Sequence, residues 1–174
     1  MPFEGFDFTG FWNESAFAKK FDCGPLTPEK IASAEDVLGY KLPASYLWLM
    51  ERQNGGIPVS KCFPTGEPTS WAEDHIAIET IFGVGKAAGN IVDETRLMVA
   101  EWGNPAIGIA ICDCPSAGHD EIFLDYRACG PEGEPAVVLI DQEGDYDITR
   151  LAGSFEEFIR GLKNDSEFDF EEDE

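Results

Sequence analysis

The chain has 174 residues, of which 43% are hydrophobic and 12% aromatic. This composition is typical of one globular domain and excludes a wholly disordered chain. No apolar run approaches the roughly 20 residues of a membrane span, and residues 1–10 lack the basic and apolar segments of a secretory signal. We therefore expect a cytoplasmic protein that binds no membrane.

The charge is strongly negative, with 34 acidic residues against 12 basic ones and a net charge of -22. Such a surface repels phosphate backbones, so nucleic acid is not the expected ligand, although charge of this size also serves solubility alone. The second half, residues 88–174, carries 22 of the acids. Seven acids and no base fall in residues 164–174, so we expect one domain over residues 1–163 and an acidic, disordered tail over 164–174.

Helices are predicted first along the chain. The Phe-rich opening predicts a short helix over residues 12–21 that packs its aromatic rings on the core. Thr27 and Pro28 are typical of an N-cap and a first helical residue, and Gly39 ends this second helix. A third helix begins at Leu42-Pro43 and stops at the Asn54-Gly55-Gly56 segment, whose residues tolerate positive φ.

Strands follow from residue 57. A half-buried pair is predicted over residues 60–63 and 76–82, then a helix over 90–102 that ends near 103–105. Apolar runs at 106–112, 121–126 and 136–140 predict an antiparallel meander.

The last predicted helix has the clearest sequence signature. Ser154 and Glu157 form a capping box at its start, and apolar residues follow at helical spacing. The expected fold is therefore a single α+β domain. It has a mainly antiparallel sheet, helices in the N-terminal half and a C-terminal helix packed on the sheet.

Sequence motifs of catalysis are missing from the chain. It has no Gly-x-Ser-x-Gly, His-Glu-x-x-His, phosphate-loop or dinucleotide-binding motif. The five cysteines include no Cys-x-x-Cys pair, and the close pair Cys112 and Cys114 matches no four-ligand site. We therefore expect no enzyme activity, no metal and no cofactor.

One cluster of polar residues still requires a choice between two interpretations. His119, Asp120 and Asp125 could hold a divalent ion in a metal-dependent hydrolase, with further acids nearby. Strand alternation, however, points Asp120 and Glu121 to opposite sides, so the ligands are not expected to converge. In the favoured interpretation, the aspartates and His119 satisfy turn amides and the other carboxylates lie in solvent.

The same region carries a family resemblance. The segments PSAGHDEIFLDYR at 115–127, GEP at 133–135 and LAGSFEEF at 151–158 are similar to the SUKH superfamily, named in part for fungal cell-wall regulators with the Smi/Knr-like domain. The segments at 31–39, 42–46 and 54–56 resemble the opening pattern of that family. The resemblance covers residues 25–162.

The resemblance implies a single α+β domain without catalytic residues. For bacterial members, it implies an immunity protein that binds a cognate polymorphic toxin, often a nuclease. A nuclease is basic where it holds nucleic acid, so an acidic protein complements it. An intracellular scaffold or regulatory adaptor that binds host proteins is the alternative function. The oligomeric state is left open.

Acidic residues on and beside the predicted hairpin are the candidate partner contacts: Asp113, Asp120, Glu121, Asp125, Asp141, Glu143 and Asp145. Trp71 and Trp102 could serve as aromatic anchors, because interface energy concentrates in such residues. For both tryptophans, a position in the core is the preferred prediction.

Overall fold

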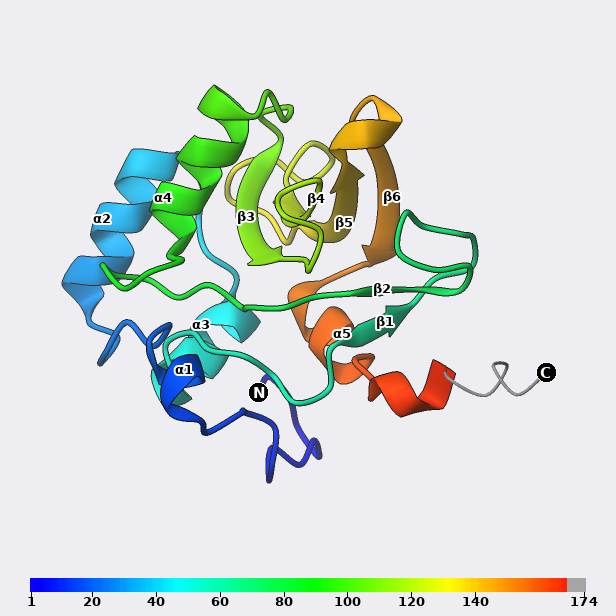
Figure 1. The fold of residues 1–174 in the computed structure, drawn as a ribbon. Helices are drawn as coiled ribbons and strands as arrows, with labels where there is room; N and C mark the ends of the chain where they lie inside the picture. Colours follow the sequence, from blue (N-terminus) through cyan, green and yellow to red (C-terminus); the bar gives the residue numbers. More distant parts are fainter. Residues whose placement is uncertain (169–174) are drawn as a thin grey trace.

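The computed structural model describes residues 1–168, and its helices occupy mainly the first half and the end of the chain (Figure 1). The helices, in chain order, are α1 (Ala16–Lys19), α2 (Pro28–Leu38), α3 (Ala44–Arg52), α4 (Ile91–Arg96), the π-helix η1 (Leu97–Glu101), the 3-10 helix η2 (Gln142–Gly144), α5 (Phe155–Arg160) and the 3-10 helix η3 (Asp165–Phe168). No helix within these residues is long and apolar enough to cross a membrane.

Two antiparallel sheets complete the domain. A small sheet pairs β1 (Cys62–Pro64) with β2 (His75–Ala77). The main sheet has the order β3-β4-β5-β6, formed by β3 (Gly108–Asp113), β4 (Asp120–Asp125), β5 (Ala136–Asp141) and β6 (Asp147–Ala152). The antiparallel meander predicted from the sequence is confirmed, with one further strand, β6.

The main sheet buries apolar side chains on both faces. Ile122 and Leu124 of β4 join the large core, to which α3 and α5 also contribute. Phe123, between them, points to the opposite face and packs with Val138 and with Met98 of η1. Helix α4 lies beside β3, so it covers only that end of the second face (Figure 1). The confirmed fold class is a single α+β domain with a C-terminal helix against the sheet.

The second and third helices form where the sequence predicts them. Thr27 accepts the backbone N–H of Lys30 through its side chain, and Gly39 ends α2 at φ +83°, a left-handed conformation that favours glycine. Helix α3 ends at Arg52, before the Asn54-Gly55-Gly56 segment. The helix predicted over residues 90–102 is confirmed as the continuous run of α4 and η1.

The opening segment differs from its prediction. Only Ala16–Lys19 is helical, because the rings before it pack as a cluster instead of following a helical repeat. Phe3 lies 5.2 Å from both Phe8 and Trp48 between ring centroids, and Phe8 lies 5.1 Å from Phe11. Phe3, Phe8 and Phe11 thus join the core as predicted, but through turns, whereas Phe17 on α1 is 59% exposed, contrary to the prediction.

Helix α5 and the residues after it carry two predictions. The Ser154 hydroxyl accepts the N–H of Glu157, as the capping box predicts, whereas the Glu157 carboxylate accepts the N–H of Gly153, one residue before the cap. Of the tail predicted over residues 164–174, the part up to Phe168 contains η3, and the Phe168 ring stacks on His75 at 4.0 Å. The remaining residues, 169–174, lie outside the described part of the chain. The domain boundary at residue 163 therefore remains a prediction.

Candidate protein-binding surface

Three chain connections meet at one end of the main sheet, and we call them together the loop end. They are residues 65–74 between β1 and β2, residues 114–119 between β3 and β4, and residues 142–146 between β5 and β6. The Ser70 hydroxyl donates to Asp120 at 2.6 Å, and the Asp120 N–H donates to the Ser116 hydroxyl at 3.0 Å. The Gln142 N–H donates to the His119 carbonyl at 2.8 Å, so all three connections are joined.

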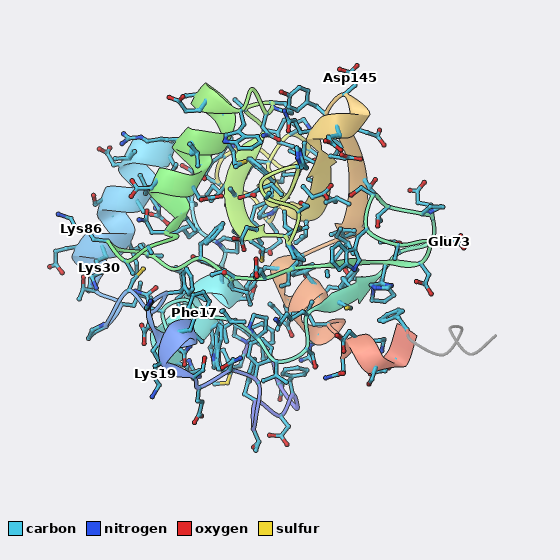
Figure 2. All side chains as sticks on the ribbon, viewed as in Figure 1. Phe17, Lys19, Lys30, Glu73, Lys86 and Asp145 are labelled. Atoms are coloured by element: carbon cyan, nitrogen blue, oxygen red, sulfur yellow. The ribbon has the colours of Figure 1, made fainter. Side chains whose placement is uncertain are left out.

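Six of the seven predicted contact residues lie on or next to the loop end. Asp113 ends β3, Asp120 and Glu121 begin β4, and Asp141 ends β5 opposite Asp120. Glu143 and Asp145 lie on the exposed tip between β5 and β6, and Asp145 is labelled there in Figure 2. Asp125 lies at the opposite end of β4, so the predicted set does not form a single cluster.

Two of the seven residues are buried, which corrects their prediction as partner contacts and, for Glu121, the interpretation that it lies in solvent. Asp120 is 2% exposed and Glu121 is 1% exposed. They point to opposite sides of the sheet, as strand alternation predicts: Glu121 shares the side of Phe123, and Asp120 that of Ile122. Direct contact with a partner is therefore limited to the other five acids in this structure.

Glu121 is a buried carboxyl without a hydrogen-bond donor at either oxygen. Burial raises its pKa well above the ordinary glutamate value, and the carboxyl of Glu94 on α4 raises it further. Contact between two carboxyls gives a hydrogen bond only when one of them is protonated. The arrangement therefore favours a protonated Glu121.

Asp113 and Asp141 have structural roles at the edges of the loop end. Asp113 accepts the N–H of Thr80 at 2.8 Å, and burial raises its pKa to about 6 despite that bond. Asp141 accepts the N–H of Gly144 at 3.2 Å and caps η2. The prediction that aspartates satisfy turn amides holds at Asp141. Asp113 instead accepts an N–H from a segment 33 positions away, and Asp120 accepts the Ser70 hydroxyl.

The two candidate tryptophans have different environments. Trp71, in the connection between β1 and β2, is 46% exposed, which corrects the preferred prediction of a core position. Trp102 is half-buried and packs at the edge of the second core cluster, where its carbonyl accepts the Tyr146 hydroxyl at 2.6 Å. Trp71 is therefore the tryptophan of the two that is available to a partner.

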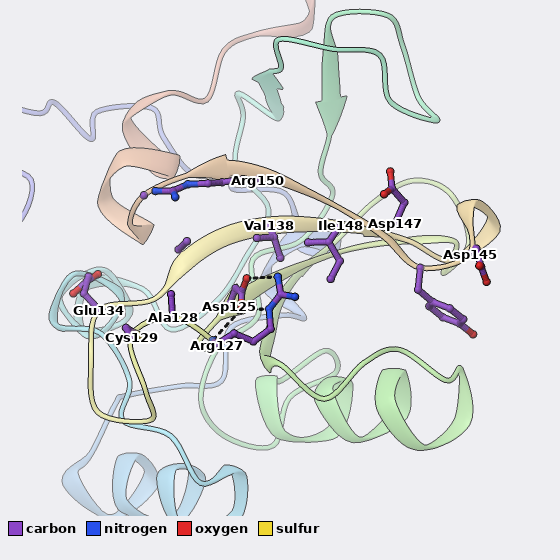
Figure 3. Close-up of a pocket in the computed structure, with 13 residues that line it drawn as sticks. Asp125, Arg127, Ala128, Cys129, Glu134, Val138, Asp145, Asp147, Ile148 and Arg150 are labelled. Carbon is purple, nitrogen blue, oxygen red and sulfur yellow. Dashed lines mark hydrogen bonds and ion pairs between the residues drawn. The ribbon is translucent and has the colours of Figure 1, made fainter.

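A groove of about 720 Å³ crosses the second face of the sheet, away from α4. Figure 3 shows Asp145 at one end of it and Glu134 and Cys129 at the other. Arg127 lies within it, and its guanidinium donates two hydrogen bonds to Asp125, at 2.8 and 3.0 Å, beside a third from its backbone N–H. These bonds lower the pKa of Asp125. Because Asp125 is already paired, its carboxylate is less available to a partner.

The arrangement of His119 does not form a metal site. Its Nδ1 lies 3.3 Å from the Gln142 amide oxygen and 3.4 Å from the Glu143 carboxylate. Asp125 is at the far end of β4, so the ligands proposed for a hydrolase do not converge. Within residues 1–168, no three histidine, cysteine, aspartate or glutamate side chains are arranged to hold a metal ion.

Cys112 and Cys114 are both buried in the large core. Burial raises the pKa of both thiols well above the ordinary cysteine value, and neighbouring carboxylates raise it further. Thiols in this state are poor nucleophiles and poor metal ligands. The pair is therefore part of the packing.

A comparison with protein families gives a match to the SUKH_6 model, described as SMI1-KNR4 cell-wall, over residues 28–159. These residues include α2 to β6 and most of α5. A comparison with curated proteins gives no match. The match covers more than half of the chain, so the protein belongs to the SUKH (SMI1-KNR4 cell-wall) family.

Proposed function

We propose that this protein is a non-catalytic immunity protein that binds and neutralises a cognate toxin in the cytoplasm of the cell that makes it. The SUKH family is known for toxin immunity proteins that are generally non-catalytic. Residues 1–168 contain no group of side chains arranged as a metal site, and the sequence contains no catalytic motif. A hydrolase therefore has no support from either. Binding to a protein is therefore the activity that the family supports.

The observation that carries the proposal is the acidic loop end of a chain in this family. Glu73, Glu143 and Asp145 are exposed there, on a protein with a net charge of -22. A surface that holds nucleic acid is basic, so an acidic partner is attracted to it and covers it. We infer that the toxin is a cationic domain, such as a nuclease, and that it is inhibited by occlusion.

The proposal is tested with defined toxins. Inactivated C-terminal domains of the toxins encoded in the same genome are purified and titrated with the protein by calorimetry. Each active domain is then expressed with and without the protein in a growth assay. We expect one cationic domain to bind at 1:1 stoichiometry and the same domain to lose its toxicity.

Two results would contradict the proposal. One is that none of the toxin domains encoded in the genome binds the protein. The other is binding to housekeeping proteins without any rescue of growth, which would instead support the scaffold or adaptor function.

A further inference from the structure

Two of the exposed large apolar side chains lie together beside the small sheet. Trp71 and Val59 are each 46% exposed and line the same cavity of about 190 Å³. Pro115, from the connection between β3 and β4, lines the cavity beside them. We call these three residues the Trp71 patch. Its centre is a tryptophan, one of the residue types at which binding energy concentrates in interfaces, and the two aliphatic side chains lie beside it.

The backbone that presents Trp71 is fixed by hydrogen bonds. The Thr69 hydroxyl accepts the N–H of Trp71 at 3.1 Å and donates to the His75 carbonyl at 2.8 Å. The Thr69 N–H donates to the Ala72 carbonyl at 2.8 Å. These bonds close a tight turn at the point where the indole is exposed.

A second contact attaches this turn to the main sheet. The Ser70 hydroxyl donates to the Oδ2 atom of Asp120 at 2.6 Å, whereas the Oδ1 atom of Asp120 is buried without a partner. A buried carboxylate oxygen without a donor destabilises a fold. In this fold the same carboxylate holds the connection between β1 and β2 against the sheet. A connection that is already ordered loses less conformational entropy when a partner binds.

The charge around the patch indicates its partner. Glu79 and Asp165 line the cavity itself, and further exposed acids lie on the same connection as Trp71 and just after Asp165: Glu67, Glu73, Asp74 and Glu167. Lys61 also lines the cavity, and Lys163, bridged to Cys62, lies on an adjacent chain segment. The patch is therefore an apolar centre within a mainly acidic rim. The complementary surface is cationic with an apolar recess that accepts an indole.

We propose that the Trp71 patch is the anchor of the toxin interface, inserted into an apolar recess of the cationic toxin domain. The inference rests on the proposed function and adds the position of the interface and the residue that dominates its affinity. The acids of the rim attract the toxin, and the indole of Trp71 slows its release.

The test compares Trp71→Ala with Phe17→Ala. Phe17 is 59% exposed on α1 and lies on the other side of the molecule from Glu73 in Figure 2, so it is a matched aromatic control. The probe is the inactivated toxin domain that binds the unmodified protein in calorimetry. We expect Trp71→Ala to raise Kd at least about 30-fold, mainly through faster dissociation, and Phe17→Ala to leave Kd unchanged.

Two more measurements separate the anchor from effects on folding and charge. Trp71→Phe keeps an apolar ring and should recover part of the affinity, with a melting temperature equal to that of Trp71→Ala. Ser70→Ala removes the hydrogen bond that attaches the 65–74 connection to Asp120. It should raise Kd about fivefold and speed hydrogen exchange of residues 65–74.

The outcomes distinguish this inference from the proposed function. Equal affinity of the unmodified protein and Trp71→Ala for the toxin overturns the anchor and leaves the immunity function standing. Absence of toxin binding by the unmodified protein overturns both. If the unmodified protein alone forms a dimer that Trp71→Ala dissociates, the patch is an interface between copies and the anchor is also wrong.

Discussion

Glu121 shows how a residue that is charged in the unfolded chain becomes part of the core. It lies between the sheet and α4, with Phe123 on the same face of β4 and the Glu94 carboxyl beside it. Neither carboxyl oxygen has a donor, and its pKa is raised by burial. Folding therefore favours the protonated side chain over the ionised one.

The first prediction follows from that raised pKa. The folded state binds the Glu121 proton more tightly than the unfolded state, so its contribution to stability is present below the ordinary glutamate pKa. This contribution is lost as the pH rises through the folded value. Glu121→Gln removes the ionisation and gives Glu94 a donor. We expect it to raise the free energy of unfolding by about 1–3 kcal/mol at pH 8 and by much less at pH 5.

Urea unfolding of both proteins at several pH values measures this difference. Glu101→Gln, at an exposed position at the end of η1, is the control and should show no such pH dependence. A Glu121→Gln variant that is less stable than the unmodified protein at pH 8 would contradict the interpretation of Glu121 as protonated in the fold.

For Asp120 and Glu121, the sequence could predict the side of the sheet to which each side chain points, but not that both are buried. Strand alternation alone places Asp120 and Glu121 on opposite sides of β4. Their burial depends on segments far away in the chain, because Ser70 reaches Asp120 across 50 positions and α4 supplies Glu94. The exposure of Trp71 likewise depends on how the 65–74 connection is attached, which no local pattern encodes.

The helices and strands that could be predicted are those with a signal in their own sequence, such as an N-cap or an apolar run. Helices α2 and α5 have their own N-caps and apolar repeats, β3 and β5 are apolar except for a terminal aspartate, and β4 has the apolar run Ile122-Phe123-Leu124 at its centre. Strand β6 reads Asp-Ile-Thr-Arg-Leu-Ala, with exposed polar residues, because it is an edge strand. The opening aromatic segment has no helical repeat, so its cluster could not be derived from local pattern.

The segment after α3 gives the second prediction. Asn54 was predicted as part of a helix stop, but its buried side chain also links three parts of the chain. Its amide donates to the carbonyls of Gly24 and Val84 at 2.9 and 2.8 Å, and its oxygen accepts the N–H of Val84 at 2.8 Å. A Cβ at Gly83 would lie 2.1 Å from the Asn54 carbonyl oxygen, so the close approach of these two backbone segments also requires glycine at position 83.

We expect Asn54→Ala to lower the free energy of unfolding by about 2–4 kcal/mol, because it leaves buried backbone groups of Val84 unpaired. Asn13→Ala removes a single exposed hydrogen bond to Ser15 and serves as the control. Denaturant unfolding measures both changes. A loss below about 1 kcal/mol for Asn54→Ala would show that water replaces the missing amide.

For the whole molecule, the net charge of -22 determines how fast a cationic partner is captured. Glu73→Lys, Glu143→Lys and Asp147→Lys together reverse exposed charge at or beside the loop end. Asp145 is left unchanged because it adopts φ +63°, where a lysine is strained. We expect the association rate with the toxin domain to fall about 10- to 100-fold at low salt.

The control reverses the same number of exposed charges elsewhere, in Glu14→Lys, Glu29→Lys and Asp36→Lys. Stopped-flow association at several salt concentrations compares the two variants. Because both carry the same net charge, the loop-end variant should lose more of its rate and of its salt dependence. Equal losses in the two variants would mean that total charge, and not the loop end, steers the toxin.

Hydrogen exchange of the protein alone and in complex with the inactivated toxin domain tests the central claim most directly, since it locates the bound surface without any substitution. The account predicts slower exchange over residues 65–74, 114–119 and 142–146 on binding, with α1 and α2 unchanged. Slower exchange confined to α1 and α2, with the loop end unchanged, would contradict it.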